Sequence, residues 1–302
     1  MPKDRNEIPP SIPYVGIAVA IVGVSFASIF IRWSESPPLV IAAYRMLLVS
    51  IILLPLATLT SKNEIRTMSR RDMAILLLIG AILAAHFFAY ISAVKMTTVA
   101  SAILLATCHP VIVGIISILV LKDTKKAVGI GILAGMSGLV IITLGDIGGG
   151  NIDGDILALI SGVFFSAYLL LGRVLRQRIS IITYVFVVFS SCALVLLGAA
   201  FITGQVMWPM PARELLIFLG LAVISTIMGH LLFNFSLRYL SASVISVSYL
   251  GEPVGAILLA AMLLDEIPSV YVLVGGMMIL VGILLTARTE RNQNGSGNGQ
   301  GH

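Results

Sequence analysis

Charged residues are scarce in this sequence. Among its 302 residues only 11% are Asp, Glu, Lys or Arg, whereas 58% are hydrophobic and the mean hydropathy is +1.06. Soluble domains carry roughly 25% charged residues, so the composition excludes a chain that is mainly soluble. It leaves no segment to bind nucleic acid and is typical of an integral membrane protein.

Cysteine is also rare, and the signatures of several chemistries are missing. Cys108 and Cys192 both fall inside long apolar runs, which predicts free thiols rather than a disulfide. No Walker motif indicates ATP hydrolysis, and the scattered histidines lack the spacing of metal ligands. We therefore expect no metal and no cofactor.

Long apolar runs fill most of the chain instead. A bilayer core of roughly 30 Å needs about 20 apolar residues per helix. Ten segments meet this requirement, at about 13–32, 37–60, 72–94, 97–121, 126–146, 154–174, 180–203, 213–237, 241–264 and 268–288. The sequence therefore predicts an all-α integral membrane protein with ten transmembrane helices in contact with the lipid bilayer.

Lys and Arg are distributed unevenly between the predicted loops. Three of them, Arg32, Lys95 and Arg213, fall on one side of the ten-helix topology, and fifteen fall on the other. Cytoplasmic loops carry an excess of Lys and Arg, which predicts that both termini are cytoplasmic. The fifteen are Lys3, Arg5, Lys62, Arg66, Arg70, Arg71, Lys122, Lys125, Lys126, Arg173, Arg176, Arg178, Arg238, Arg288 and Arg291.

The chain also contains an internal repeat. The stretch "AHFFAYISAVKMTTVASAILLATCHPVIVGIISILVLKD" aligns with "GHLLFNFSLRYLSASVISVSYLGEPVGAILLAAMLLDE" with one gap, and it places His86 over His230 and Pro110 over Pro253. Five helices per repeat is an odd number, so the two repeats are predicted to be inverted, with a substrate site between them. The expected parts are a cytoplasmic N-terminal segment (1–12), two repeats (13–146 and 147–288) and a disordered cytoplasmic tail (289–302).

At this level the chain resembles the drug/metabolite transporter superfamily in its ten-helix form with two EamA-type repeats. The resemblance is carried by the two-repeat layout, by "PPLVIAAYRMLL" around Arg45, by "VLKD" and "LLDE" at the ends of two helix pairs, and by "GEPV". It implies a secondary transporter in the cytoplasmic (inner) membrane. Such a protein moves a small metabolite, an amino acid or a related compound, commonly outward, by alternating access through a central cavity. The first repeat departs from the usual pattern, because it carries "CHPV" where an acidic or small residue before proline is more familiar.

Glu252 lies near the centre of its predicted helix. An ionised side chain there costs roughly 2.5 to 3.5 kcal/mol on insertion scales, so it should face a cavity or a partner. Ser248 and Tyr249 fall on or beside the same helical stripe. We expect these residues to line the substrate cavity, where Glu252 either contacts a cationic part of the substrate or exchanges a coupling proton. A protonated, hydrogen-bonded structural carboxyl is the alternative.

Other polar residues inside the apolar runs are weaker candidates for substrate binding or coupling. Arg45 either binds an anionic group of the substrate or clamps the structure. The remaining candidates are His109, the pairs His86 with Tyr90 and His230 with Asn234 at i, i+4, and Tyr168 beside a partly apolar pocket. For each of them ordinary packing is the alternative.

Two prolines inside predicted helices are candidate hinges. Pro110 and Pro253 each remove a backbone donor, which predicts free carbonyls at Ala106 and Tyr249 and flexible points in the helices. The same prolines in membrane helices can also be merely tolerated.

Two other classes of function stay open at this stage, an intramembrane enzyme and a channel or sensor that uses the buried His and Glu residues. No Ser/His/Asp set, continuous polar pore or output domain favours either class. The sequence does not decide between a monomer and a homodimer.

Overall fold

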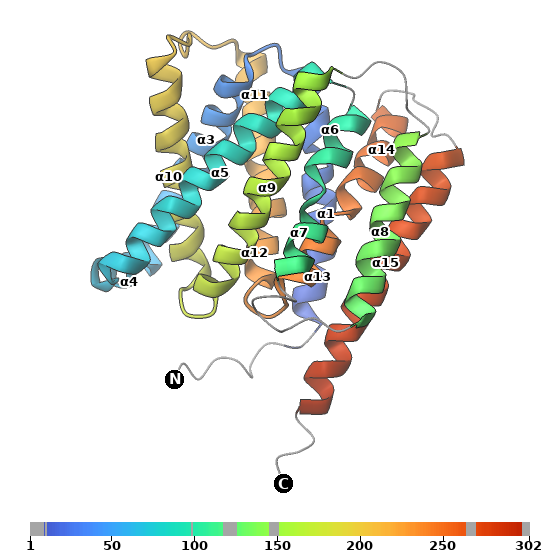
Figure 1. Cartoon of the computed structure of the whole chain (residues 1–302). Helices are drawn as coiled ribbons and strands as arrows, with labels where there is room; N and C mark the ends of the chain where they lie inside the picture. The colour runs from blue at the N-terminus through green and yellow to red at the C-terminus, as the bar shows by residue number, and fades with distance from the viewer. Residues whose placement is uncertain are drawn as a thin grey trace.

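The structure is a computed structural model that describes residues 9, 11–97, 99–116, 126–144, 151–263 and 270–297. Within these residues all regular structure is helical (Figure 1). Six continuous stretches are long and apolar enough to cross a membrane: Ile12–Trp33, Pro38–Thr60, Arg70–Met96, Ile152–Arg176, Ile181–Ile202 and Ala212–Ser236. Two shorter apolar helices, Gly129–Ile141 and Leu273–Leu285, lie among them. The predicted all-helical membrane fold is confirmed.

The helices follow the predicted segments in both halves. The first half contains α1 (Ile12–Ser25), α2 (Ala27–Trp33), α3 (Pro38–Thr60), α4 (Lys62–Thr67), α5 (Arg70–Met96), α6 (Val99–Ala106), α7 (His109–Ile116) and α8 (Lys126–Leu144). The second contains α9 (Ile152–Arg176), α10 (Ile181–Ile202), α11 (Ala212–Gly220), the π-helix η3 (Leu221–Leu231), α12 (Leu232–Ser236), α13 (Ala242–Ser248), α14 (Gly251–Leu263) and α15 (Val270–Gly297).

The C-terminal end differs from its prediction. Residues 289–297 were expected to be disordered, whereas α15 continues through them to Gly297. Extending a helix that has already formed requires no new nucleation, which explains how a polar sequence can continue it. The "VLKD" motif, most of "LLDE" and the predicted outer loop before residue 151 lie outside the described residues.

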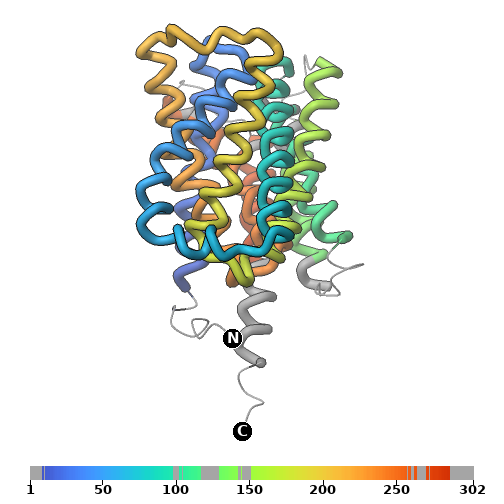
Figure 2. The backbone as a smooth tube through the Cα atoms, turned by 90° about the vertical axis from the view of Figure 1, so that its left-hand side faces the viewer, coloured from blue at the N-terminus to red at the C-terminus, as the bar shows by residue number. Residues whose placement is uncertain are grey.

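The packing of the helices reflects the repeat. The first helix of the second repeat, α9, packs on α5 of the first repeat. In the same way, the first helix of the first repeat, α1, packs on η3 of the second repeat. The helices α3 and α10 lie side by side, as do α8 and α15 (Figures 1 and 2). In Figure 1 the chain rises through α1 from the side where both termini lie and descends through α9 towards that side. Opposite directions for these equivalent helices are what inverted repeats require.

Glycines allow the equivalent helices to approach closely. A Cβ atom on Gly23 of α1 would lie 2.7 Å from the backbone oxygen of Ile224 in η3. A Cβ atom on Gly162 of α9 would lie 2.7 Å from the backbone oxygen of Ala106. Small residues at such contacts bring backbones together in membrane proteins, so both glycines fix the distance between helices that surround the centre of the bundle.

At the end of the bundle away from the termini, Glu214 of the second repeat binds the connection between α2 and α3 of the first repeat. The carboxylate of Glu214 accepts hydrogen bonds from the Ser34 hydroxyl at 2.5 Å, the Ser36 hydroxyl at 2.7 Å and the Glu35 backbone N–H at 3.0 Å. These donors lie between α2 and α3. The contact therefore joins the start of α11 to the start of α3, across the two repeats.

Glu64 makes the inverted counterpart of this contact near the termini. Its carboxylate accepts hydrogen bonds from the Ser180 backbone N–H at 2.9 Å, from the Ser180 hydroxyl and from the Thr183 hydroxyl at 2.5 Å. Partial burial by itself would raise the pKa of Glu64, but the hydrogen bonds from Ser180 and Thr183 outweigh it and lower the pKa below its ordinary value. The two glutamates thus anchor α3 and α10 at opposite ends of the bundle.

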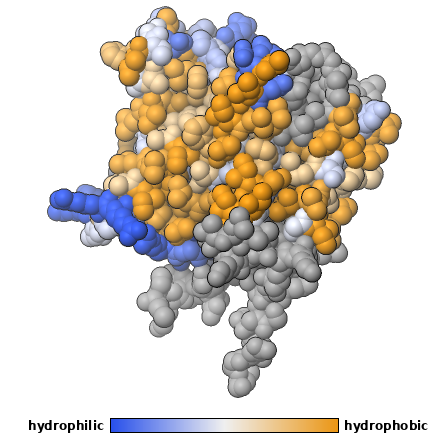
Figure 3. Space-filling model, viewed as in Figure 1, coloured by the Kyte–Doolittle hydropathy of each residue, from blue (hydrophilic) through white to orange (hydrophobic). Residues whose placement is uncertain are grey.

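The outer surface is apolar between two polar ends. Figure 3 shows hydrophobic side chains over the middle of the visible face, with hydrophilic residues concentrated at its upper and lower edges. The exposed apolar residues include Leu59, Leu194 and Phe201, which are 84%, 70% and 87% exposed. Such a belt matches the hydrocarbon layer of a bilayer.

Candidate functional site

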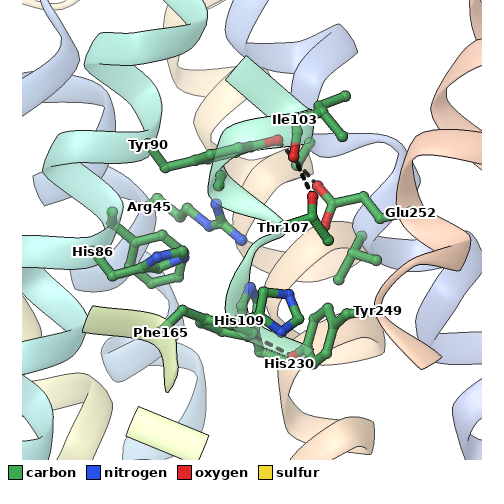
Figure 4. A pocket seen from close by; sticks show the side chains of 14 residues that line it. Arg45, His86, Tyr90, Ile103, Thr107, His109, Phe165, His230, Tyr249 and Glu252 are labelled. Atoms are coloured by element: carbon green, nitrogen blue, oxygen red, sulfur yellow. Dashed lines mark hydrogen bonds between the residues drawn. The ribbon is translucent and has the colours of Figure 1, made fainter. Parts of the chain in front are cut away.

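A central cavity of about 40 Å³ lies between the two repeats. By a measure of roughly 10 to 15 Å³ per water, it has room for only a few water molecules. Figure 4 shows polar and aromatic side chains converging on this space. The lining residues are Val24, Ala27, Arg45, His86, Phe87, Tyr90, Ile103, Ala106, Thr107, His109, Phe165, His230, Tyr249 and Glu252.

Two broken helices border the cavity. One break separates α6, which ends at Ala106, from α7, which begins at His109, and the other separates α13 from α14 after Ser248. Each break lies just before its proline, so Pro110 and Pro253 occupy the first turn of the following helix. Proline is tolerated there because the first-turn N–H groups have no partner within the helix. The interruption therefore precedes each proline rather than kinking a continuous helix around it.

One consequence predicted for the prolines is wrong. The carbonyl of Tyr249 was expected to be free, but it accepts a hydrogen bond of 2.9 Å from the backbone N–H of Glu252. A tight turn at the end of α13 uses this carbonyl before Pro253 could leave it unpaired. The cavity therefore obtains its polar character mainly from side chains.

Glu252 is joined to the opposite wall of the cavity. The Tyr90 hydroxyl on α5 donates a hydrogen bond of 3.1 Å to its carboxylate, whereas Glu252 itself lies on α14 (Figure 4). Its backbone oxygen accepts a bond of 3.4 Å from the Ser25 hydroxyl on α1. The only carboxyl group among the lining residues thus lies where helices from both repeats meet.

Arg45 supplies a cation to the same cavity. The residue is 1% exposed, its guanidinium lies 4.3 Å from the ring centroid of Phe87, and its Nε donates a bond of 2.7 Å to the Thr226 hydroxyl. Its Nη2 has no hydrogen-bond partner among the described residues. The ion pairs between described residues, Arg178 with Asp72 and Arg213 with Glu35, do not include Arg45 or Glu252. A buried guanidinium with a spare donor is suited to bind a planar anion.

The position of Thr226 explains how Arg45 is held. Thr226 lies in η3, and its hydroxyl also donates to the backbone oxygen of Leu221, five residues earlier, at 3.0 Å. The π-helix therefore shapes both this contact and the approach of His230 to the cavity. π-helical turns occur frequently at functional sites.

Three histidines surround the ring of Phe165. Their ring centroids lie 4.7 Å (His86), 4.9 Å (His109) and 6.0 Å (His230) from the centroid of Phe165. Each also has a polar contact at Nδ1: His86 with Ser161 Oγ at 2.9 Å, His109 with Ser246 Oγ at 2.7 Å and His230 with the Tyr249 hydroxyl at 3.3 Å. These contacts orient the rings, and the aromatic cluster forms one end of the cavity in Figure 4.

The structure brings most of the predicted site residues together. Seven of them line the cavity: Arg45, His86, Tyr90, His109, His230, Tyr249 and Glu252. The other three, Ser248, Asn234 and Tyr168, do not line it. Ser248 donates to the backbone oxygen of Val244 at 2.8 Å, and Asn234 donates to the Tyr168 hydroxyl at 2.5 Å.

Several contributors were missed by the sequence prediction. Phe87, Thr107, Ser161, Thr226 and Ser246 line the cavity or orient residues that do. Phe87 adjoins the predicted His86, which was the available signal for it. The three serine and threonine partners have no distinguishing spacing. Among the described residues no cluster of His, Cys, Asp and Glu could hold a metal.

Comparison with known proteins assigns the fold to a family of transporters. The profile of the EamA-like transporter family matches residues 11–144 and again 152–288. An "Uncharacterized transporter" of Clostridium kluyveri is 25% identical over 257 residues, which cover 81% of this chain and 82% of that protein. A crystal structure of a protein with 17% identity superposes with a TM-score of 0.75 over 94% of this chain and 99% of the other, which shows a shared fold.

The profile matches account for nearly the whole chain, once in each half. The resemblance inferred from the repeats is thereby confirmed, and an intramembrane enzyme is no longer an alternative. The chain belongs to the EamA-like transporter family of the drug/metabolite transporter superfamily, and it is a multi-pass membrane transporter built from two EamA repeats.

Proposed function

We propose that this transporter moves a small zwitterionic metabolite, an amino acid or a close relative, through the central cavity by alternating access. The unpartnered Nη2 of Arg45 carries this proposal, because a buried guanidinium needs an acceptor and a carboxylate supplies one. Glu252 lines the same cavity and offers a carboxylate to an ammonium group. The substrate would thus be held at both of its charged ends.

Charge balance supports a substrate without net charge. Arg45 and Glu252 contribute one permanent cation and one carboxyl to the lining of the cavity, so the pair is already balanced before a substrate enters. A zwitterion preserves that balance, whereas a simple anion or cation would leave one buried charge uncompensated, at high cost in a membrane. The hydrogen bond from Tyr90 to Glu252 would be exchanged for one from the substrate ammonium.

The size of the cavity supports a moving carrier rather than an open pore. About 40 Å³ does not hold an amino acid, so the surrounding helices must separate to admit one. The breaks before His109 and after Ser248 offer places where short helices could pivot, which would make Pro110 and Pro253 the borders of hinges. We place both termini in the cytoplasm, on the distribution of Lys and Arg, and expect net movement outward.

A binding screen followed by transport tests the proposal. Purified protein is heated with each of the twenty common L-amino acids, because a ligand of the native state raises its apparent stability. The best binder is then compared with the amine that lacks its carboxylate and with the acid that lacks its ammonium group. The proposal expects binding and proteoliposome transport of the amino acid and loss of both with the two analogues. Equal binding of all three compounds, or of none of the amino acids, would overturn it.

A further inference from the structure

A second polar cluster lies beyond the cavity, one helical turn nearer the termini. Asn234 of α12 donates through Nδ2 to the Tyr168 hydroxyl at 2.5 Å and to the backbone oxygen of His230 at 2.7 Å. The hydroxyl oxygen of Tyr184 on α10 lies against Gly172, one helical turn after Tyr168 on α9, 2.6 Å from the position that a Cβ atom on Gly172 would occupy. We call Tyr168, Asn234 and Tyr184 the inner cluster.

Two atoms of the inner cluster are buried without a hydrogen-bond partner in the part of the chain that the structure describes. They are Oδ1 of Asn234 and the hydroxyl of Tyr184, in residues that are 2% and 0% exposed. Buried polar atoms nearly always have hydrogen bonds, so this pair indicates a partner that enters from elsewhere. The amide oxygen only accepts, and the phenol both donates and accepts. A partner that carries N–H donors can therefore satisfy both oxygens.

The inverted repeat relates this cluster to the opposite end of the cavity. Tyr90 follows His86 by one helical turn, and Asn234 follows His230 in the same way, in segments that the repeat aligns. The two helices run in opposite directions, α5 away from the termini and η3–α12 towards them (Figure 1). Tyr90 and Asn234 thus lie on opposite sides of the cavity. Each makes one side-chain hydrogen bond to a different helix, Tyr90 to Glu252 and Asn234 to Tyr168.

We propose that the Asn234–Tyr168 bond is the closed gate on the side of the termini, and that the inner cluster briefly binds an ammonium group as it passes. The Tyr90–Glu252 bond is the corresponding gate on the other side. This inference rests on the proposed transport through the central cavity. When Asn234 and Tyr168 separate, Oδ1 of Asn234 and the oxygen of Tyr184 become acceptors for the N–H groups of the passing ammonium.

Access of a small reagent to the cavity tests the gates without any substrate. Thr107 lines the cavity and is replaced by cysteine in a protein whose Cys108 and Cys192 are alanine. The rate of modification by 2-aminoethyl methanethiosulfonate is measured from each side of sealed vesicles, with free cysteine on the far side to quench reagent that crosses. Gel filtration verifies that each variant is folded.

The expected rates depend on the side. Loss of one hydrogen bond by Tyr168→Phe should raise modification from the termini side about fivefold and leave the other side unchanged. Tyr90→Phe should do the reverse. Asn234→Ala removes the same bond from its other end and should also raise the rate from the termini side, but by less than Tyr168→Phe, because it removes an acceptor for the ammonium reagent as well. It serves as a second test of the gate if Tyr168→Phe folds poorly. The control Tyr44→Phe removes a tyrosine bond to the backbone of Met207. Neither residue lines the cavity, so this change should alter neither rate.

Binding by the inner cluster has its own readout. In the Tyr168→Phe protein, a further Tyr184→Phe change should slow modification by the ammonium reagent but not by neutral methyl methanethiosulfonate. Equal effects on both reagents would overturn the binding role. Unchanged or equally raised rates from both sides in Tyr168→Phe and Asn234→Ala would overturn the gate. Neither result depends on an amino acid being transported, so the proposed substrate class is tested separately.

Discussion

The Tyr90 hydroxyl donates a hydrogen bond of 3.1 Å to the carboxylate of Glu252, and this bond joins α5 of the first repeat to α14 of the second. It crosses the cavity that Arg45 enters from α3. A carboxyl in a membrane is costly unless it has a partner. Tyr90 is that partner in the structure, and a substrate ammonium would be its partner during transport.

Removing the charge of Glu252 should strongly reduce transport while the fold persists. Glu252→Gln keeps the size of the side chain and its bond with Tyr90, so thermal stability should change by less than about 1 kcal/mol. Transport of the best-binding amino acid should fall by about tenfold or more, since a charged hydrogen bond of roughly 1.5 kcal/mol or more is lost. Proteoliposome uptake and melting curves measure both. A stable protein that transports at the normal rate would show that the carboxyl is structural.

The Glu64 anchor predicts a dependence of stability on acid pH. Glu64→Gln should lower the free energy of unfolding by about 1 kcal/mol at neutral pH, a value reduced for its partial exposure. Because the pKa of Glu64 is lower in the folded protein, its stabilising effect is complete above the unfolded pKa of roughly 4.3 and is lost as the pH falls through the folded pKa. Melting curves of the two proteins should therefore differ by a constant amount above about pH 5 and converge below it. A difference that grows towards acid pH would contradict this account.

Glu214, the counterpart of Glu64 at the other end of the bundle, should also stabilise the fold. Glu214→Gln should destabilise at least as much as Glu64→Gln, by about 1 to 3 kcal/mol, because Glu214 is only 5% exposed and accepts three hydrogen bonds. Denaturation of the purified variants in one detergent compares them directly. If Glu214→Gln were neutral, the contact with Ser34 and Ser36 would not anchor α3.

Labelling of introduced cysteines tests the orientation. Asn63 lies on the side of the termini in α4, and Val206 lies in the exposed connection between α10 and α11. In a protein without its native cysteines, an impermeant maleimide added outside intact cells should label Val206→Cys and not Asn63→Cys. The opposite pattern would place both termini outside.

The sequence predicted the helices well because hydropathy alone decides which segments enter a bilayer. The repeat then located the polar residues at its centre, including Glu252 and both aligned histidines. Contacts between distant helices were not predictable in the same way. Thr226 bonds Arg45 from the π-helix η3, and no local pattern in the sequence predicts that geometry.

The broken helices show a second feature that the sequence did not predict correctly. The sequence placed an irregularity at each proline, but the chain turns just before Pro110 and Pro253, where a proline in the first helical turn has no lost bond to compensate. Asn234 and Tyr168 were expected beside the substrate, whereas the structure places them one turn beyond the cavity. Helical spacing predicts the face of a helix on which a residue lies. It does not predict how far along the helix the cavity extends, because that depends on the large rings that border the cavity, such as Phe165.

The most direct test of the central claim compares Arg45→Gln with the unaltered protein for two ligands, the best-binding amino acid and the amine that lacks its carboxylate. Arg45 is assigned to the carboxylate, so the variant should bind the amino acid about 10- to 100-fold more weakly, the equivalent of a charged hydrogen bond of roughly 1.5 to 3 kcal/mol. It should bind the amine, which meets only Glu252, at least as well as the unaltered protein does. An equal loss of affinity for both ligands in the folded variant would contradict the account, because it would mean that Arg45 supports the structure and does not read the substrate.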